Sequence, residues 1–140
     1  MKKILLSLFM IAAALLLFNG CDLFGPPAVS PDKRISDFTA NLNTSSRLST
    51  YTYISSSASL YDQIKVSTWW DSTAFSSFYS SFSFNLSYAS SSSGIQTYTG
   101  SMSSSAATYN SVVVTFKEDL TGSDVWYINS ISLEGTPVIY

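Results

Sequence analysis

The chain has no histidine and only one cysteine among its 140 residues. Without histidine it cannot build Ser–His–Asp or Cys–His nucleophilic sites, and it lacks the commonest zinc ligand. It also has no glycine-rich phosphate-binding loop and no G-x-S-x-G nucleophile motif. We therefore predict no catalytic residues and expect the protein not to be an enzyme.

Charged residues are also scarce, at 11% of the chain, with 7 lysines and arginines against 9 acidic residues. No basic cluster is present, so the electrostatics disfavour a nucleic-acid partner. The segment "KEDLTGSD" gathers Glu118, Asp119 and Asp124 around Gly122. An EF-type calcium loop would need an acid at Lys117. We therefore predict no metal site and no cofactor other than covalent lipid.

A long apolar run is found only at the start of the chain. Lys2 and Lys3 precede an almost entirely apolar stretch, 4–18, which ends at Asn19 and Gly20. This order of charge, short apolar run and small residues is typical of a secretory signal. A membrane-spanning helix needs about 20 apolar residues, which is more than this run offers. The pattern predicts a signal peptide over residues 1–20.

The single cysteine, Cys21, follows this stretch directly, in the sequence "LFNGC". This sequence resembles the lipobox of bacterial lipoproteins, although Phe18 stands where leucine is usual. The resemblance implies that the signal is cut before Cys21 and that its thiol carries diacylglycerol, with further acylation such as palmitate. Two or three acyl chains hold a protein firmly in a membrane, because each buried methylene contributes about 0.8 kcal/mol. We expect a lipid-anchored protein of the bacterial cell envelope, facing the periplasm or the cell exterior.

The rest of the chain is expected to form a flexible tether over residues 21–30 and a single domain over residues 31–140. Gly25, Pro26 and Pro27 disfavour helix in the tether. Ser30-Pro31-Asp32 is a typical helix start. Behind it, Ile35, Phe38 and Leu42 form one apolar stripe.

Two different periodicities follow along the domain. The aromatic-rich stretch 47–75 predicts one or two more helices. From Phe82 onward the period changes to two, which predicts strands over 82–88, 95–102, 108–117 and 124–133. We therefore predict an α+β fold in which N-terminal helices pack on one face of an antiparallel meander of about four strands. A mainly β sandwich is the alternative.

The segment "VVVTFKEDLTGSDVWYINSISLEG", residues 112–135, is similar to the last hairpin of NTF2-like (cystatin-like) domains. The resemblance implies a cone-shaped roll around an apolar cavity. Trp70, Phe75 and Trp126 are the candidates to line such a pocket. Should the domain be an NTF2-like enzyme, Asp62 and Asp71 are the candidate acids, since aromatic residues flank both.

Three functions fit these observations. The first is a non-enzymatic envelope lipoprotein that binds a small apolar ligand or another envelope protein. The second is a surface adhesin or interaction module, suggested by strands rich in serine, threonine and tyrosine. The third is an NTF2-like enzyme. An open cavity or a filled core in the folded domain would discriminate between them.

Overall fold

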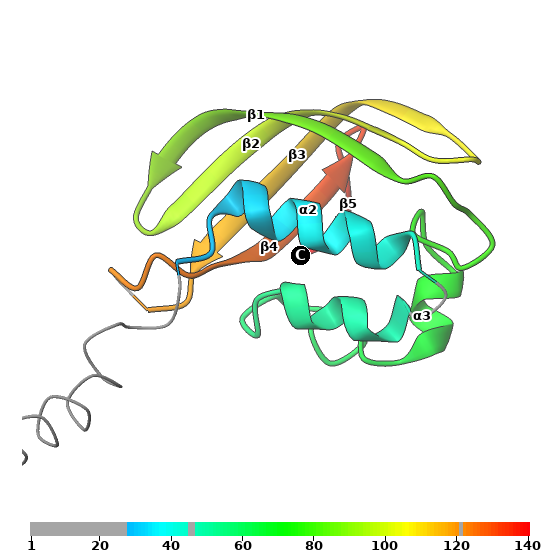
Figure 1. Cartoon of the computed structure of the whole chain (residues 1–140), viewed down its shortest axis with the longest axis horizontal. Coiled ribbons are helices and arrows are strands. Elements are labelled where there is room, and N and C mark those ends of the chain that lie inside the picture. Colours follow the sequence, from blue (N-terminus) through cyan, green and yellow to red (C-terminus); the bar gives the residue numbers. More distant parts are fainter. Residues whose placement is uncertain (1–27, 45–46, 121) are drawn as a thin grey trace, which may run out of the picture.

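The computed structural model describes residues 28–44, 47–120 and 122–140. Its main element is one five-stranded antiparallel sheet in which neighbours along the chain are neighbours in space. Figure 1 shows this sheet arching over a layer of short helices that covers one of its faces. The strands are β1 (Ser83–Ser92), β2 (Ile95–Ser103), β3 (Thr108–Glu118), β4 (Trp126–Leu133) and β5 (Thr136–Ile139).

Helix α2 (Pro31–Leu42) begins as the sequence predicts. Ser30 caps it by accepting a hydrogen bond from the backbone N–H of Lys33 at 3.2 Å, which satisfies one of the free donors of the first turn. Phe38 and Leu42 are fully buried against the sheet. Ile35 is only half-buried, because it lies on the side of α2 that faces β1.

The predicted α+β fold is wrong, and so is the sandwich alternative. The described chain is mostly β, with 41% of its residues in strands and 22% in helices, and all of its strands belong to one open sheet. The NTF2-like roll implied by the resemblance is not what this chain forms. The stretch expected to hold further helices contains the 3₁₀-helix η1 (Arg47–Tyr53), the five-residue α3 (Ser67–Asp71) and connecting turns.

Local hydrogen bonding by hydroxyl side chains explains why this stretch does not form long helices. Serine and threonine bond to nearby backbone groups and so favour turns over helix interiors. Thr52 donates to the carbonyl of Ser49, and the backbone N–H of Ser57 donates to the Ser55 hydroxyl. The apolar residues of this stretch reach the core from irregular backbone instead.

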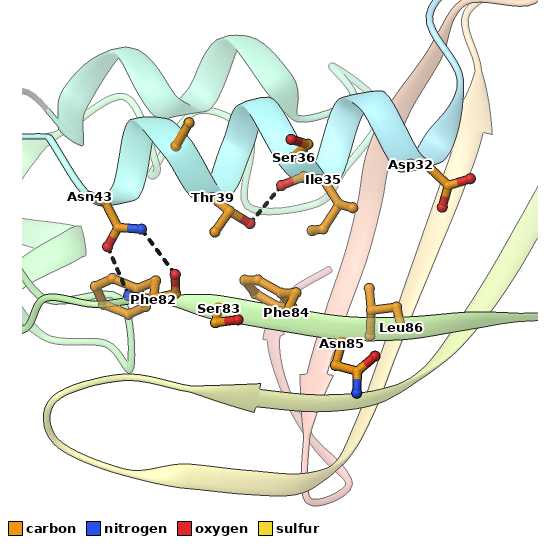
Figure 2. Close-up of a pocket in the computed structure, with 11 residues that line it drawn as sticks. Asp32, Ile35, Ser36, Thr39, Asn43, Phe82, Ser83, Phe84, Asn85 and Leu86 are labelled. Atoms are coloured by element: carbon orange, nitrogen blue, oxygen red, sulfur yellow. Dashed lines mark hydrogen bonds between the residues drawn. The ribbon is translucent and has the colours of Figure 1, made fainter.

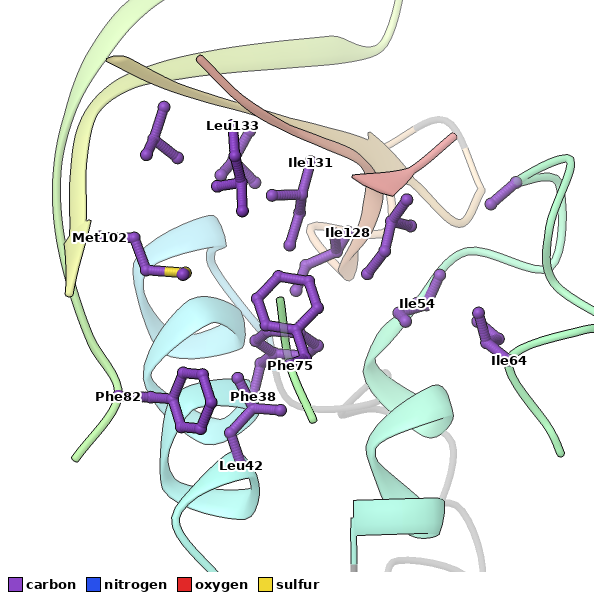
Figure 3. Close-up of a cluster of buried hydrophobic side chains, with 14 of the residues drawn as sticks. Phe38, Leu42, Ile54, Ile64, Phe75, Phe82, Met102, Ile128, Ile131 and Leu133 are labelled. Carbon is purple, nitrogen blue, oxygen red and sulfur yellow. The ribbon is translucent and has the colours of Figure 1, made fainter. Parts of the chain in front are cut away.

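The core fills the space between the sheet and the helical layer (Figure 3). Phe38 of α2 and Phe75 meet edge to face, with ring centroids 5.7 Å apart, and Phe75 also contacts Trp70. The sheet contributes alternate residues of its strands, as expected for a sheet buried on one face. The apolar strand residues with at most 3% exposure are Met102, Val112, Val114, Phe116, Ile128, Ile131, Leu133 and Ile139.

The four predicted strands are present as β1 to β4, and a fifth strand was not predicted. Glu134 and Gly135 turn the chain back with positive φ angles of 50° and 80°. Beyond them β5 pairs with β4. Pro137 lies within β5, which an outermost strand tolerates because one of its edges needs no N–H donor.

Two contacts fix the start of α2 to the sheet. Val29, within the predicted tether, pairs with the start of β4: its N–H donates to Asp124 and its carbonyl accepts from Trp126. Arg34 of α2 donates to the Trp126 carbonyl at 2.6 Å and lies over the ring of Tyr127. The start of α2 is therefore held against β4, while its opposite side faces β1.

Candidate binding groove between α2 and β1

The two edges of the sheet differ in their protection. At one edge, β5 is four residues long and contains Pro137, and the chain beyond it is tied down because the N–H of Leu60 donates to the carbonyl of Tyr140. At the other edge, β1 runs for ten residues, "SFNLSYASSS", without a proline or a charged side chain. Proteins usually blunt an exposed edge with short strands, charges or proline. Strand β1 has none of these three protections, and its only irregularity is a register shift between Tyr88 and Ser90, beyond the residues Ser83 to Leu86.

A groove of about 490 Å³ lies along this unprotected edge, between β1 and α2 (Figure 2). The strand contributes residues Ser83 to Leu86, and Phe82 lies directly before it. The helix contributes one of its sides, which includes Ile35, Thr39 and Asn43 at spacings of about one turn. The two walls run antiparallel, so the C-terminal end of α2 lies beside the start of β1.

Asn43 closes one end of the groove by acting as a strand neighbour would. Its Nδ2 donates to the carbonyl of Phe82 at 2.9 Å, and its Oδ1 accepts from the N–H of Phe82 at 2.8 Å (Figure 2). An amide side chain can reproduce both bonds of a paired strand residue, because it carries a donor and an acceptor. This pair shows that the backbone groups of Phe82 face the side of α2.

The same direction follows for every second residue of β1. Backbone N–H and C=O groups of a strand alternate between its two edges. The backbone oxygen of Asn85 faces Gly100 of β2, so Phe84 and Leu86, which alternate with it, carry their backbone groups on the free edge, as Phe82 does. Their side chains are half-buried and lie between the strand and the helix.

The other end of the groove is acidic and aromatic. Asp32, in the first turn of α2, is the one charged side chain among the described residues that line the groove. Two residues beyond Leu86, Tyr88 is more than half exposed and meets Tyr98 edge to face at 5.8 Å. Burial raises the pKa of Tyr98, and the nearby Asp32 carboxylate raises it further. Asp32 and the two tyrosines therefore share one environment.

The structure does not bring Trp70, Phe75 and Trp126 together around this groove. Trp70 and Phe75 are buried in the core, where the Trp70 Nε1 donates to the carbonyl of Ile64 at 2.8 Å. Trp126 is half-buried at the start of β4. None of the three lines this groove or a smaller cavity, of about 220 Å³, which lies beside Tyr61, Asp119 and Tyr127.

The candidate acids Asp62 and Asp71 are both exposed on the helical layer. Asp62 accepts from the Lys65 ammonium at 2.9 Å, and Asp71 accepts from the Ser77 hydroxyl. Within the described ranges, no group of three or more acidic or sulfur-bearing side chains is placed to hold a metal ion. Glu118 of the "KEDLTGSD" hairpin accepts from the backbone of Asp124 and so closes its own loop. Cys21 lies outside the described residues.

Sequence reasoning did not find the groove. The available signals were an uncharged, proline-free strand at the start of the meander and an asparagine directly after a helix. Both are common features, and only the sheet order shows that β1 is outermost. Comparison of the chain with protein-family models, curated proteins and solved structures found no match. Among the described helices, none is long and apolar enough to cross a membrane.

Proposed function

We propose that this chain is a non-enzymatic lipoprotein of the bacterial cell envelope, anchored through lipid on Cys21, that binds another envelope protein in the groove between α2 and β1. The signal-like residues 1–20 and the lipobox-like "LFNGC" support the anchor. The groove supports the binding role. The observation that carries it is the uncharged, proline-free edge strand β1, whose first four residues line that groove.

The chemistry of the groove favours a protein segment over a small apolar ligand. Ser36, Thr39 and Asn43 contribute hydroxyl and amide groups to one wall, and the backbone edge of β1 forms the other. Ligand pockets for small apolar molecules are mostly hydrophobic and enclosing. A polypeptide, in contrast, satisfies a row of backbone donors and acceptors with its own.

The anchor is tested by Cys21→Ser, in cells fed radioactive palmitate. The wild-type protein should be labelled and found in the membrane fraction, because acyl chains on Cys21 bury methylenes in the bilayer. The variant should lose the label and retain the uncut signal. Labelling that persists in Cys21→Ser would refute the lipid attachment.

The binding role is tested by photocrosslinking in intact cells. A photoreactive amino acid at Ser36, an exposed position on the groove wall, should crosslink to one defined envelope protein. The same amino acid at Thr99, exposed on the opposite face of the sheet, is the matched control. Equal capture from both positions, or capture from Thr99 alone, would contradict a partner in the groove.

The outer face of the sheet supports a second candidate, a surface adhesin. Alternate residues of β2 to β4 that point away from the core are mainly hydroxyl-bearing, and Thr115 and Ser130 bond across strands at 2.6 Å. Such a face offers donors and acceptors without charge. An adhesin must be reachable from outside, so protease added to intact cells should degrade it. Full protection on intact cells, with digestion after lysis, would exclude this role.

A further inference from the structure

We infer that the partner binds by adding one strand to the free edge of β1, antiparallel to it, and that its segment carries a lysine or arginine beside Asp32. This inference rests on the proposed function and specifies the chemistry of the partner. The segment is extended, places small apolar side chains toward α2, and is otherwise uncharged.

The backbone of β1 supplies the first argument. Phe84 and Leu86 follow Phe82 by two and four residues. Like Phe82, they carry their N–H and C=O groups on the free edge of β1. Asn43 already makes at Phe82 the two bonds that an added strand would make. The incoming segment therefore ends beside the Asn43 side chain and extends from there along β1 toward Tyr88. Backbone pairing of this kind provides affinity in strand-addition complexes.

The side chains of the groove supply the second argument. Ile35 of α2 lies opposite Phe84 and Leu86, which point toward the helix (Figure 2). An added strand places alternate residues on this side of the sheet, where valine-sized side chains would extend the apolar surface. The residues between them point outward, on the same face as Ser83 and Asn85, and remain polar.

The sheet order gives the orientation of the added strand, and charge separates a foreign partner from a second copy. Every pair of neighbouring strands in the sheet is antiparallel, so we assign the same orientation to the added strand. Its amino end then lies beside Asp32, where a carboxylate and the exposed ring of Tyr88 both favour a cation. Strand β1 itself contains no lysine or arginine. A second copy paired through β1 would therefore leave Asp32 without a counter-charge.

The first measurement is amide hydrogen exchange of the full-length protein in mild detergent, read at single residues. Without ligand, the Phe84 and Leu86 amides should exchange faster than those of Ser83 and Asn85, which bond to β2. The probe is a seven-residue acetylated and amidated peptide that alternates serine with valine and begins with lysine. On adding it, protection should rise at Phe84 and Leu86 and remain unchanged at Ser83 and Asn85.

The second measurement is the affinity of this peptide by titration calorimetry. Replacing its lysine by glutamate should weaken binding, and Asp32→Asn should weaken the lysine peptide about two- to fivefold, as an exposed ion pair does. Asp37→Asn is the matched control, because it removes the same charge from α2 outside the groove. Two further peptides carry N-methyl groups on alternate amides, one peptide on each of the two alternate sets. Their affinities should differ, because only one set of amides faces β1.

The outcomes separate the two proposals. Protection that alternates along β1, together with a lysine preference that Asp32→Asn removes, supports strand addition. Capture of a partner at Ser36 without alternating protection overturns strand addition and leaves the proposed function standing, whereas absence of capture at Ser36 overturns the proposed function. Protection of Phe84 and Leu86 that grows with protein concentration alone, accompanied by a dimer mass, would identify a second copy as the occupant and refute a cationic partner.

Discussion

Gly100 of β2 is the position where a single added carbon should damage the fold most directly. It lies opposite Leu86 in the pairing of β1 with β2. A Cβ placed on it would lie 2.0 Å from the backbone oxygen of Asn85, 2.9 Å from the Asn85 carbonyl carbon and 3.0 Å from the Leu86 Cα. All three are backbone atoms of β1, so no side-chain rotation relieves the contact. Gly100→Ala must therefore displace β1.

The expected cost follows from this geometry. Overpacking a well-packed site costs about 1–3 kcal/mol, and more where backbone must move. We expect Gly100→Ala to lower the free energy of unfolding by about 3 kcal/mol or more, which corresponds to a fall in Tm of roughly 10 °C or more for a domain of this size. Gly94→Ala is the matched control: it has no neighbour within 4 Å and a φ of 73°, so it should cost about 1–2 kcal/mol of backbone strain alone.

Urea unfolding followed by circular dichroism measures both variants. Gly100→Ala should also speed amide exchange along β1, because displacement weakens its bonds to β2, and it should weaken any ligand of the groove that β1 lines. A Gly100→Ala protein as stable as Gly94→Ala, with unchanged exchange in β1, would refute the close crossing of β1 over Gly100 and the wall position derived from it.

Further predictions concern residues that hold the groove in place. Arg47 donates to the carbonyls of Phe75, Ser76 and Tyr79 and lies over the ring of Phe82. Arg47→Met should lower the free energy of unfolding by about 3 kcal/mol, because the carbonyls lose their partner and hydrogen bonds to charged groups contribute about 1.5–3 kcal/mol each. A loss under 1 kcal/mol in urea unfolding would contradict this. Asn43→Ala should cost about 1–2 kcal/mol for two bonds, and the amide of Phe82 should then exchange as fast as that of Phe84. The raised pKa of Tyr98 means that the folded state holds the phenol proton more tightly than the unfolded state. The contribution of this group to the free energy of unfolding is therefore complete below pH 10 and is lost as the pH rises above 10. In Tyr98→Phe the free energy of unfolding should fall less steeply with pH in this range, and an unchanged slope would argue against the buried hydroxyl.

Local patterns in the sequence were sufficient for the regular elements. The alternation of Phe84 and Leu86 with polar residues predicts a strand, because a half-buried strand exposes every second side chain. Ser30 and Pro31 predict the start of α2, because the hydroxyl cap and the fixed φ act within one turn. Such signals depend on neighbours in sequence, and the structure bears both out.

The same kind of reasoning overestimated the helix over residues 47–75, where the structure has only the 3₁₀-helix η1 and the five-residue α3, and this changed the fold class. Aromatic and aliphatic residues there have spacings close to helical, but Ser and Thr hydroxyls compete for the backbone. Ile64 and Phe75 are fully buried all the same. Burial of an apolar side chain needs only a path to the core, and turns supply that path as well as a helix does.

The sequence by itself determined where α2 starts, where β1 to β4 lie and which faces of those four strands are apolar, since these depend on capping and on a period of two. It also contains the signal-like start and the cysteine that follows it. Only the tertiary structure decided that β1 is outermost and that Asn43 lies against Phe82, 39 residues away. The physical reason is that an edge exists only relative to the other strands: which backbone groups remain open depends on how the whole sheet is assembled.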